Sequence, residues 1–447
     1  MRIVAGAAEA RRTLLRRAPL DEPDLPAAVR ETIRRVFGAD LDAGAVVERI
    51  LWDVRREGEA AVRRYNEQLD GVSPAGSELP LLVSPAEIRT AYSQVEPSLV
   101  GALRTAASRI RDYHERQLAH SARSFEEDGL GQIVTPLRRV GLYIPGNTVV
   151  YPSTLLMMAV PARVAGVKEV VVATPVAPDG SVSPLKLVAA DIAGVGRVFR
   201  AGGVQGIAAL AYGAGPVPKV DKICGPGNIF VTLAKKRLYG EVGIDGIFGP
   251  SETVVVADAA ADPELVAADL LAGAEHDELA TAILITDSPE LAQAVQAALE
   301  RDVDSLARAG VARASLDARG GAVVVESIAE AAELAGEFAP EHLCLHVQDV
   351  DRLLEEGLSA GCLFAGAYSV ESIGDYTAGP SHVMPTGGSA AYASPLGVQD
   401  FLKVTSLVRL DRRMAEEIGP AAAAIARAEG FTGHARAIES RIKGRAR

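Results

Sequence analysis

A glutamate and a histidine, Glu341 and His342, stand side by side between Pro340 and the apolar run LCLHV. A histidine side chain titrates near neutrality and can accept a proton from a substrate hydroxyl, while a neighbouring carboxylate can activate water. The two residues are therefore a candidate acid–base pair, provided that other segments of the chain bring partners to them.

Three further histidines stand near carboxylates or in glycine-rich segments. His276 ends a helical stretch in AEHD, His382 shares the loop GDYTAGPSHVMPTGG with Asp375, and His434 follows Glu429 in EGFTGH. A lone histidine is more often structural than catalytic, but four in such surroundings favour a functional site. Histidine and aspartate are suitable zinc ligands, although the separations match no short metal-binding motif. Of the other histidines, His114 and His120 are interpreted as surface residues of a polar helix, and His346 as a core or solvent-facing residue of a strand.

Glycine turns follow several predicted strands, although no strict GxGxxG is present. AGGVQG (201–206) and CGPGNIF (224–230) each lie between a strand and a helix, and YIPGNT (143–148) places Tyr143 at the end of a strand. Free N–H groups at a helix start favour phosphate, and ligands of open α/β sheets bind at the carboxyl ends of strands. Because α/β proteins use glycine at such turns routinely, this signal for nucleotide binding is weak.

Short β-branched runs alternate with helical stretches from about residue 139 onward, in two successive series. This pattern predicts an α/β fold with two doubly wound, Rossmann-like parallel-sheet domains. The segment ELPLLVS (78–84) is expected as a strand that joins the second sheet. We expect a helical N-terminal arm at residues 1–30 and a first α/β domain, with the acid–base pair, at residues 31–138 plus 250–395. A second α/β domain is expected at residues 139–249, and a small helical tail at residues 396–447. The tail is too small for its own core, so we expect it to pack on another domain or subunit.

Composition narrows the class of protein. The net charge of −12 over 447 residues argues against a nucleic-acid binder. Three scattered cysteines without a CxxC predict reduced thiols. The N-terminus lacks the apolar region of a signal peptide, and Pro161 and Arg163 interrupt the most apolar stretch before it could span a membrane. We therefore expect a cytoplasmic protein.

Taken in order, nine segments resemble the histidinol dehydrogenase family, whose members use zinc and NAD to complete histidine biosynthesis. They run from about residue 139 to residue 438 in the family's order and near its spacing. The segments are RVGLYIPG, PARVAGVKEVVVATP, AGGVQGIAALAYG, VDKICGPGNIFVT, GPSETVVVAD, DLLAGAEHD, FAPEHL, GDYTAGPSHVMPTGG and EGFTGHARAI.

The resemblance implies a role for individual residues. Glu341 and His342 match the family's acid–base pair. Contacts to the substrate histidinol are implied for Ser251, His276, His342, Asp375, His382, Glu429 and His434. Zinc ligands are implied at His276, Asp375 and His434, and contacts to NAD at Tyr143, Gln205 and Asn228, within residues 139–249. The family also forms intertwined homodimers, in which the tail carrying His434 completes the partner's active site.

One departure from the family pattern concerns the metal. Gly273 occupies the position of the usual glutamine ligand, one helical turn before His276. We expect weaker zinc binding, with water or His382 as a replacement, and tighter binding in Gly273→Gln. Phe248 and Asn147 are smaller departures. These departures leave two alternatives open. One is a paralogue that oxidises another small polar alcohol, such as an amino alcohol or a hydroxylated sulfonate, and the other is a metal-poor, non-catalytic homologue. A zinc hydrolase is disfavoured, because it would not need the glycine turns that suit NAD.

Overall fold

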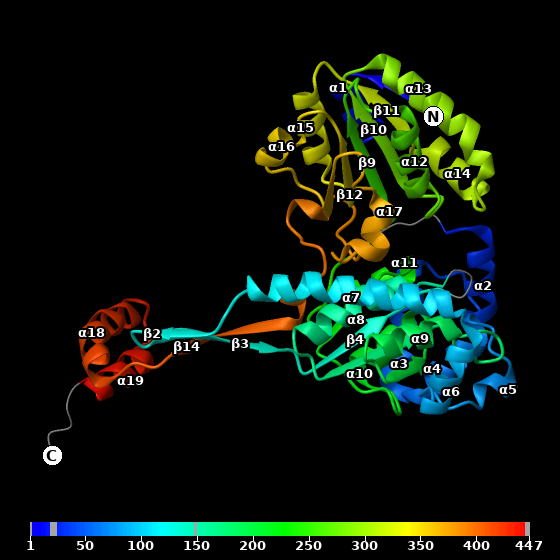
Figure 1. Ribbon diagram of the computed structural model, residues 1–447. Coiled ribbons are helices and arrows are strands. Elements are labelled where there is room, and N and C mark those ends of the chain that lie inside the picture. Colours follow the sequence, from blue (N-terminus) through cyan, green and yellow to red (C-terminus); the bar gives the residue numbers. More distant parts are fainter. Residues whose placement is uncertain (1, 18–24, 147–149, 443–447) are drawn as a thin grey trace. The chain divides into compact units, whose positions relative to one another are not determined.

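The computed structural model describes residues 2–17, 25–146 and 150–442, which fall into two compact units. Unit 1 comprises residues up to 119 and residues 137–401, and unit 2 comprises residues 120–136 and the chain from residue 402 onward. Unit 1 contains two separate parallel sheets, sheet A and sheet B (Figure 1). The predicted α/β class with two doubly wound sheets is confirmed.

Sheet A has six parallel strands. Their order is β1 (Arg2–Ala5), β11 (Gly321–Val324), β10 (Thr281–Thr286), β9 (Glu252–Ala257), β12 (His342–His346) and β13 (Cys362–Ala365). From β9 in the middle, the chain winds outward to β10 and β11 on one side and then to β12 and β13 on the other, which is the doubly wound order. The first strand, β1, falls where a helical arm was expected; it joins the edge of the sheet beside β11.

Helices cover both faces of sheet A because its strands are apolar on both sides. In β9, Val255 and Ala257 point to one core, while Val254 and Val256 point to the other. The first core is completed by α12 (Pro263–Ala274), α13 (Pro289–Asp302) and α14 (Ala309–Arg319). The second is completed by α1 (Ala7–Arg12), α15 (Ile328–Phe338) and α16 (Val350–Glu355).

Sheet B repeats the same winding with five parallel strands. Their order is β6 (Arg197–Arg200), β5 (Glu169–Thr174), β4 (Arg139–Tyr143), β7 (Lys222–Cys224) and β8 (Gly243–Ile244). One face packs against α10 (Gly203–Tyr212) and α11 (Ile229–Leu238). Beyond these strands the chain contributes α8 (Pro152–Val164) and α9 (Pro184–Ile192), which contact each other, with α8 also against β4 and β5.

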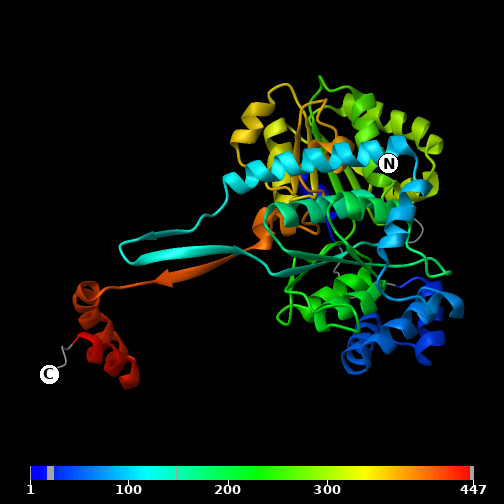
Figure 2. The same cartoon turned by 60° about the horizontal axis from the view of Figure 1, so that its bottom comes forward.

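The N-terminal helices pack against sheet B. The expected grouping of residues 31–138 with residues 250–395, which form sheet A, is therefore wrong for these helices. Side chains of α2 (Ala27–Phe37), α3 (Ala43–Glu57) and α4 (Glu59–Leu69) share one core with β5, β6, α10 and α11. The long helix α7 (Pro97–Ala119) lies beside α8 in both views (Figure 1, Figure 2). Short helices complete this region: α5 (Pro74–Ser77) and α6 (Pro85–Ala91).

The segment ELPLLVS forms no regular strand and does not join sheet A. It makes an isolated antiparallel bridge, Leu82 to Phe199, at the outer strand β6 of sheet B. Pro80 lacks an N–H donor, and Ser84 caps α6 through its side chain. Too few residues remain between the two to form a longer ladder.

Unit 2 is small and contains a hairpin-like sheet and two helices. Strand β14 (Leu402–Val408) pairs antiparallel with β3 (Leu130–Pro136), which pairs with β2 (Phe125–Glu127). Helices α18 (Arg412–Ala428) and α19 (Thr432–Ile442) pack on each other through three buried alanines. In the part of the chain that the structure describes, no helix has both the length and the apolar character needed to cross a bilayer.

A glycine after β7 is required by the close approach of two strand ends. Gly225 has a φ of 132°, and a Cβ there would lie 2.1 Å from the carbonyl oxygen of Tyr143. Gly225→Ala should therefore lower the free energy of unfolding by roughly 2–4 kcal/mol, measured by urea denaturation. Gly240→Ala is the matched control, because Gly240 has a φ of 108° with no atom within 4 Å; it should cost only about 1–2 kcal/mol. Equal losses in both variants would contradict the steric argument.

Candidate active site

The candidate acid–base pair lies at the amino-terminal edge of sheet A. Glu341 immediately precedes β12, and His342 is its first residue, paired in register with Thr253 of β9. The two residues are 7% and 3% exposed. The backbone N–H of Glu252 donates to Glu341 Oε2 over 3.2 Å. The strand edge therefore holds a buried imidazole next to a buried, oriented carboxylate.

Three carboxylates surround the imidazole of His342. Its Nδ1 lies 3.8 Å from Glu341 Oε2 and 3.6 Å from Glu371 Oε1, and its Nε2 lies 3.6 Å from Asp375 Oδ1. Among the described residues, neither ring nitrogen has a hydrogen-bond partner, and the same is true of Asp375 Oδ1. The polar atoms are thus buried and aimed at one another without being satisfied, an arrangement that marks a functional site.

The excess of carboxylates controls protonation in this cluster. Burial lowers the pKa of His342, but the negative charges of Glu371, Glu341 and Asp375 outweigh it and raise the pKa to about 10. Burial raises the pKa of Glu341 to about 8 and that of Glu371 to about 7. Two of the carboxylates thus resist ionisation, and a bound cation would favour their charged forms.

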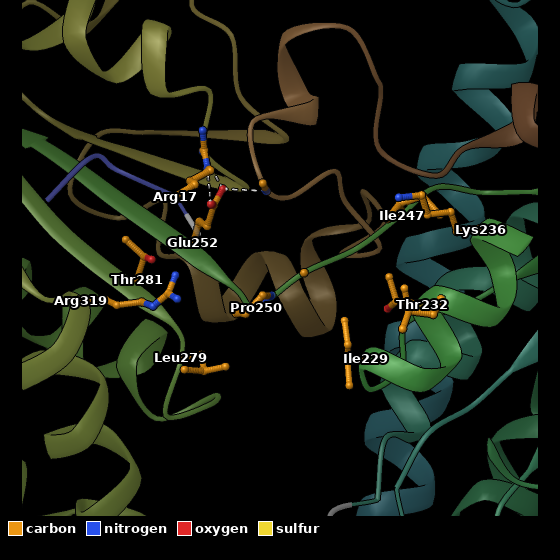
Figure 3. Close-up of a pocket in the computed structure, with 13 residues that line it drawn as sticks. Arg17, Ile229, Thr232, Lys236, Ile247, Pro250, Glu252, Leu279, Thr281 and Arg319 are labelled. Atoms are coloured by element: carbon orange, nitrogen blue, oxygen red, sulfur yellow. Dashed lines mark hydrogen bonds and ion pairs between the residues drawn. The ribbon is translucent and has the colours of Figure 1, made fainter. Parts of the chain in front are cut away.

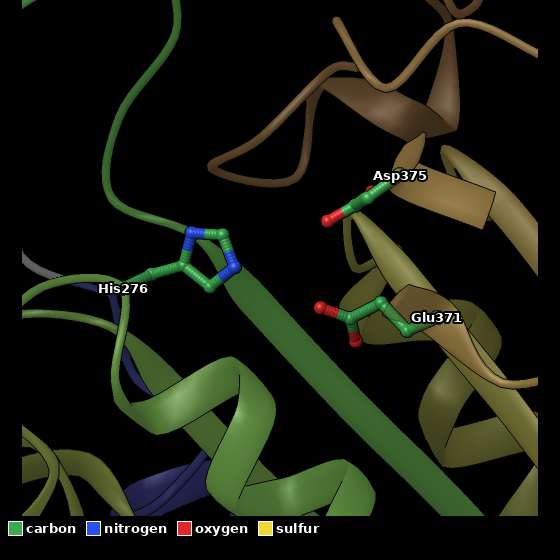
Figure 4. A group of neighbouring side chains, drawn as sticks. All are labelled: His276, Glu371 and Asp375. Carbon is green, nitrogen blue, oxygen red and sulfur yellow. The ribbon is translucent and has the colours of Figure 1, made fainter. Parts of the chain in front are cut away.

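Two of the expected metal ligands, His276 and Asp375, come together in this cluster. His276 follows α12, and Asp375 lies in a π-helical turn, Gly374–Ala378, directly after the short helix α17 (Glu371–Ile373). Donor atoms of His276, Glu371 and Asp375 all lie within 4.8 Å of one another (Figure 4). The imidazole of His276 faces both carboxylates across this space.

His382 is held in place by both of its ring nitrogens. Nε2 lies 2.9 Å from Thr154 Oγ1, and Nδ1 lies 2.8 Å from the backbone oxygen of Asp375. His382 and Asp375 border a cavity of about 370 Å³. His382 therefore helps to fix the π-helical turn and also lines this cavity.

Ser251 precedes β9, at the same edge of sheet A as His342, and its carbonyl accepts a hydrogen bond from Thr281. Glu429 and His434 belong to unit 2, where both are exposed and the His434 ring lies 5.2 Å from that of Phe431. The cluster itself lies in unit 1. Of the remaining histidines, His114 was interpreted as a surface residue but is fully buried in α7, which packs against α8; its Nδ1 lies 2.8 Å from the Ile110 carbonyl oxygen.

A cleft of about 430 Å³ opens beside the start of β9 (Figure 3). Arg17 and Glu252 form a bidentate ion pair on its wall, with distances of 2.6 and 2.9 Å. The guanidinium of Arg17 also stacks over the ring of Phe338, 3.7 Å from its centroid. Since the backbone of Glu252 donates to Glu341, this ion pair helps to hold the acid of the candidate pair in place.

The three residues implied for NAD lie at the carboxyl-terminal side of sheet B. Tyr143 ends β4, and its hydroxyl accepts a hydrogen bond from the N–H of Gly203 over 3.0 Å. Gln205 lies in the first turn of α10 and is fully buried. Asn228 caps α11 through its side chain. Tyr143 ends β4, and Asn228 follows the neighbouring strand β7. The winding of the sheet reverses between these two strands, and ligands of such sheets bind there.

Two titratable side chains at this side of sheet B, the buried Lys186 and the partly buried Asp70, were not identified from the sequence. Lys186 donates to the carbonyl of Gly146 over 2.6 Å and to Thr174 Oγ1 over 2.8 Å, and burial lowers its pKa to about 8. Asp70 accepts a hydrogen bond of 3.1 Å from Gln205 Nε2. Both residues lie in segments whose composition resembles ordinary helices, so the sequence carried no signal for them.

Asp70 predicts a specific pH dependence of stability. Burial raises its pKa to about 7, against about 3.9 in an unfolded chain. Between these values the folded protein retains a proton that the unfolded chain has lost, so the free energy of unfolding falls as the pH rises. Urea denaturation at about pH 5 and about pH 7.5 should show this fall in the wild type relative to Asp70→Asn. Parallel pH profiles for the two proteins would contradict it.

Glu371 and Thr253 are the residues of the cluster that sequence reasoning missed. Glu371 stands four residues before Asp375, a spacing that places two side chains on one face of a helix. That spacing was an available signal for Glu371. Thr253 carried none, because it reads as one more β-branched residue of a buried strand.

Comparison with known proteins identifies the family. A family model described as histidinol dehydrogenase matches residues 35–442. A histidinol dehydrogenase from Deinococcus radiodurans is 49% identical over 446 residues, covering 99% of this chain and 100% of that protein. One from Moorella thermoacetica is 52% identical, covering 89% of this chain and 94% of that protein.

A solved structure agrees with these sequence comparisons. The crystal structure of histidinol dehydrogenase from Elizabethkingia anophelis superimposes with a TM-score of 0.89 at 31% identity, covering 99% of this chain and 98% of that one. Both the sequence and the fold thus match over nearly the whole length. The chain therefore belongs to the histidinol dehydrogenase family and is an oxidoreductase.

Proposed function

We propose that this enzyme oxidises L-histidinol to L-histidine through histidinal, using two molecules of NAD, at the end of histidine biosynthesis. The observation that carries the proposal is the buried His342, whose two ring nitrogens lack hydrogen-bond partners among the described residues and face three carboxylates. Relatives named histidinol dehydrogenase support the choice of substrate. The free cysteines at positions 224, 344 and 362 suit a cytoplasmic enzyme.

In the first oxidation, His342 acts as general base in its neutral form; a divalent cation held among the neighbouring carboxylates would offset the negative charges that raise its pKa. The substrate hydroxyl loses its proton to His342, and a hydride leaves the same carbon, which converts the alcohol to an aldehyde. NAD supplies the hydride acceptor in both oxidations. The three carboxylates around His342 stabilise the imidazolium that forms when the proton arrives.

In the second oxidation, Glu341 activates water as a carboxylate, the form that a cation bound nearby would favour over the protonated one. Addition of water to the aldehyde gives a hydrate, and loss of a proton and a hydride from the hydrate gives the carboxylic acid. The N–H of Glu252 holds one oxygen of Glu341, which leaves the other oxygen for water. Two hydrides leave in total, so the complete reaction forms two NADH.

The residues of the cluster fit a zinc ion. The buried Asp375 Oδ1 has no hydrogen-bond partner among the described residues, and His276 and Asp375 supply the nitrogen and oxygen donors that zinc prefers. We propose that these two residues hold zinc together with His434 of a second copy of the chain. A zinc ion there would orient the substrate through its imidazole and amine.

We further propose that NAD binds at the carboxyl-terminal side of sheet B, in contact with Tyr143, Gln205 and Asn228. The N-terminus of α11 offers free N–H groups for a phosphate. Lys186 supports this placement, because it brings a buried positive charge to the same strand ends and donates there to two neutral oxygens.

The active unit is proposed to be a homodimer with shared active sites. The described part of unit 2 buries three alanines between α18 and α19 while Ile418, Ile425 and Phe431 are 53%, 60% and 55% exposed. An apolar surface of this kind on so small a unit favours contact with another protein surface, here that of a second copy of the chain. In this arrangement, Glu429 and His434 serve the site of the other subunit.

A second candidate is a paralogue that oxidises another small polar alcohol, favoured by Gly273 at the usual ligand position. The Phe248 departure has a structural reason, since the ammonium of the buried Lys235 lies 4.5 Å from the centroid of its ring; the departure at Asn147 lies outside the described residues. The test is NADH formation by the purified protein with histidinol and with a panel of amino alcohols and hydroxylated sulfonates. Two NADH per histidinol support the proposal, and turnover of another alcohol alone would overturn it.

A further inference from the structure

Position 273 is closed to any side chain by its neighbour in sheet A. A Cβ added to Gly273 would lie 2.4 Å from Thr253 Oγ1 and 2.8 Å from Thr253 Cβ. Thr253 is fully buried in the middle of the sheet, and a β-branched side chain has few alternative rotamers. The expectation that Gly273→Gln would tighten zinc binding does not fit this packing, because glutamine could enter only by displacing Thr253.

The hydroxyl that closes position 273 holds another carboxylate in the cluster. Thr253 Oγ1 donates to Glu371 Oε2 over 2.9 Å. The Glu371 side chain is 1% exposed, and its other oxygen, Oε1, lies 3.6 Å from His342 Nδ1. The threonine thus fixes one oxygen of Glu371 and leaves the second directed into the site.

We propose that Glu371 is the metal ligand that replaces the missing glutamine, so that this chain supplies His276, Glu371 and Asp375. Their donor atoms lie within 4.8 Å of one another (Figure 4): His276 follows α12, Glu371 lies in α17, and Asp375 lies in the π-helical turn after it. This inference rests on the metal-dependent function proposed above. The inference adds a third ligand from this chain, the carboxylate of Glu371, at the place where the family has a neutral amide and where water was expected as the replacement.

The alternative replacement from the same loop, His382, is unsuitable. Both of its ring nitrogens are engaged, with Thr154 and with the backbone of Asp375. In contrast, Asp375 Oδ1 and both nitrogens of the buried His342 are without partners among the described residues. The carboxylates of Glu371 and Asp375 together also balance the charge of a divalent ion, whereas a neutral side chain at position 371 would leave one positive charge unbalanced.

The test measures zinc affinity in the full-length protein, independently of activity. Metal is removed with a chelator, and rebinding of zinc is followed by competition with a chromogenic chelator and by metal analysis. Glu371→Ala should weaken zinc binding by at least about 100-fold, and Thr253→Val, which leaves the carboxylate but frees it, by about 10-fold. Glu371→Gln retains an oxygen donor and the shape of the side chain, and it should lie between them.

Glu341→Gln is the matched control. Glu341 is also a buried carboxylate beside His342 but lies outside the donor group, so its loss should change zinc affinity by no more than about threefold. Replacing zinc by cobalt gives a second readout, because the visible spectrum of bound cobalt should change in Glu371→Gln but not in Glu341→Gln. Gly273→Gln should weaken zinc binding and lower the urea midpoint, because it pushes Thr253 away from Glu371.

The outcomes separate this inference from the proposed function. If the Glu371 variants and Glu341→Gln bind zinc equally well, while the wild type binds zinc and oxidises histidinol, Glu371 is not a ligand and the function stands. If zinc binding depends on Glu371 but histidinol is not oxidised, the ligand assignment stands and the substrate is wrong. If the wild type binds no zinc, both the ligand assignment and the role of the metal are overturned.

Discussion

His342→Ala should lower the turnover number for histidinol oxidation by roughly 10²–10⁴-fold, the usual contribution of a general base. The size of the effect follows from the geometry, since His342 is buried at the edge of sheet A with three carboxylates placed to stabilise its protonated form. The KM for histidinol should change less than the turnover number, because other residues bind the substrate in this proposal. Steady-state NADH formation measures both constants.

His346→Gln is the matched control for this variant. His346 lies on the same strand, β12, and is also buried, but it stands at the opposite end, 2.8 Å from Asp269. Its replacement removes an imidazole from the strand without touching the candidate site, so folded protein should keep turnover within a few-fold of the wild type. Equal losses in both variants would show that His342→Ala acts through the strand and not through chemistry.

Glu341→Gln distinguishes the two oxidations of the same mechanism. The amide can still accept a hydrogen bond from the N–H of Glu252, so the side chain should keep its position but lose its ability to accept a proton from water. Oxidation of added histidinal should therefore slow more than oxidation of histidinol to histidinal. A uniform loss in both steps would contradict a role for Glu341 in hydration.

The strands of sheets A and B could be predicted from sequence because they are buried on both faces. Runs such as ETVVVA and EVVVAT are continuous in β-branched residues and alternate with helices, a pattern that only a covered parallel sheet explains. Strand β1 escaped this reasoning. It has four residues, mostly exposed, and pairs with β11 alone at the sheet edge, so its own residues carry no core pattern.

The position of the N-terminal helices could not be predicted in the same way. Their apolar positions indicate that one side of each helix is buried, for example Val47, Ile50 and Val54 in α3. An apolar helix face is satisfied by any apolar surface of suitable shape, so the pattern does not indicate which sheet it covers. Grouping residues 31–138 with sheet A failed for that reason.

At the site, the sequence indicated residue types but not the space between them. The resemblance to a family placed His276 and Asp375, and the structure brings both together. It also identified Gly273 as a missing ligand. It could not show that Thr253 fills the space beside Gly273 and binds Glu371, because residues 253, 273 and 371 meet only after the strands and helices have packed.

The proposed sharing of active sites rests on the composition of the C-terminal tail. Ile418, Ile425 and Phe431 are apolar and more than half exposed, whereas the buried residues between α18 and α19 are alanines. Three alanines bury too little apolar area to hold two helices in a stable unit. A second copy of the chain would cover this surface and receive His434, which stands three residues after Phe431.

Mixing two inactive variants should therefore restore activity. His434→Ala removes the proposed partner ligand, and His342→Ala removes the base, so each homodimer has two defective sites. A heterodimer places an intact His342 opposite an intact His434 in one of its two sites. After dissociation and random reassociation of equal amounts, about a quarter of the wild-type turnover should return, because half of the dimers are mixed and each has one intact site. Differently tagged chains allow the heterodimer to be isolated, and no activity in it would mean that His434 serves its own subunit.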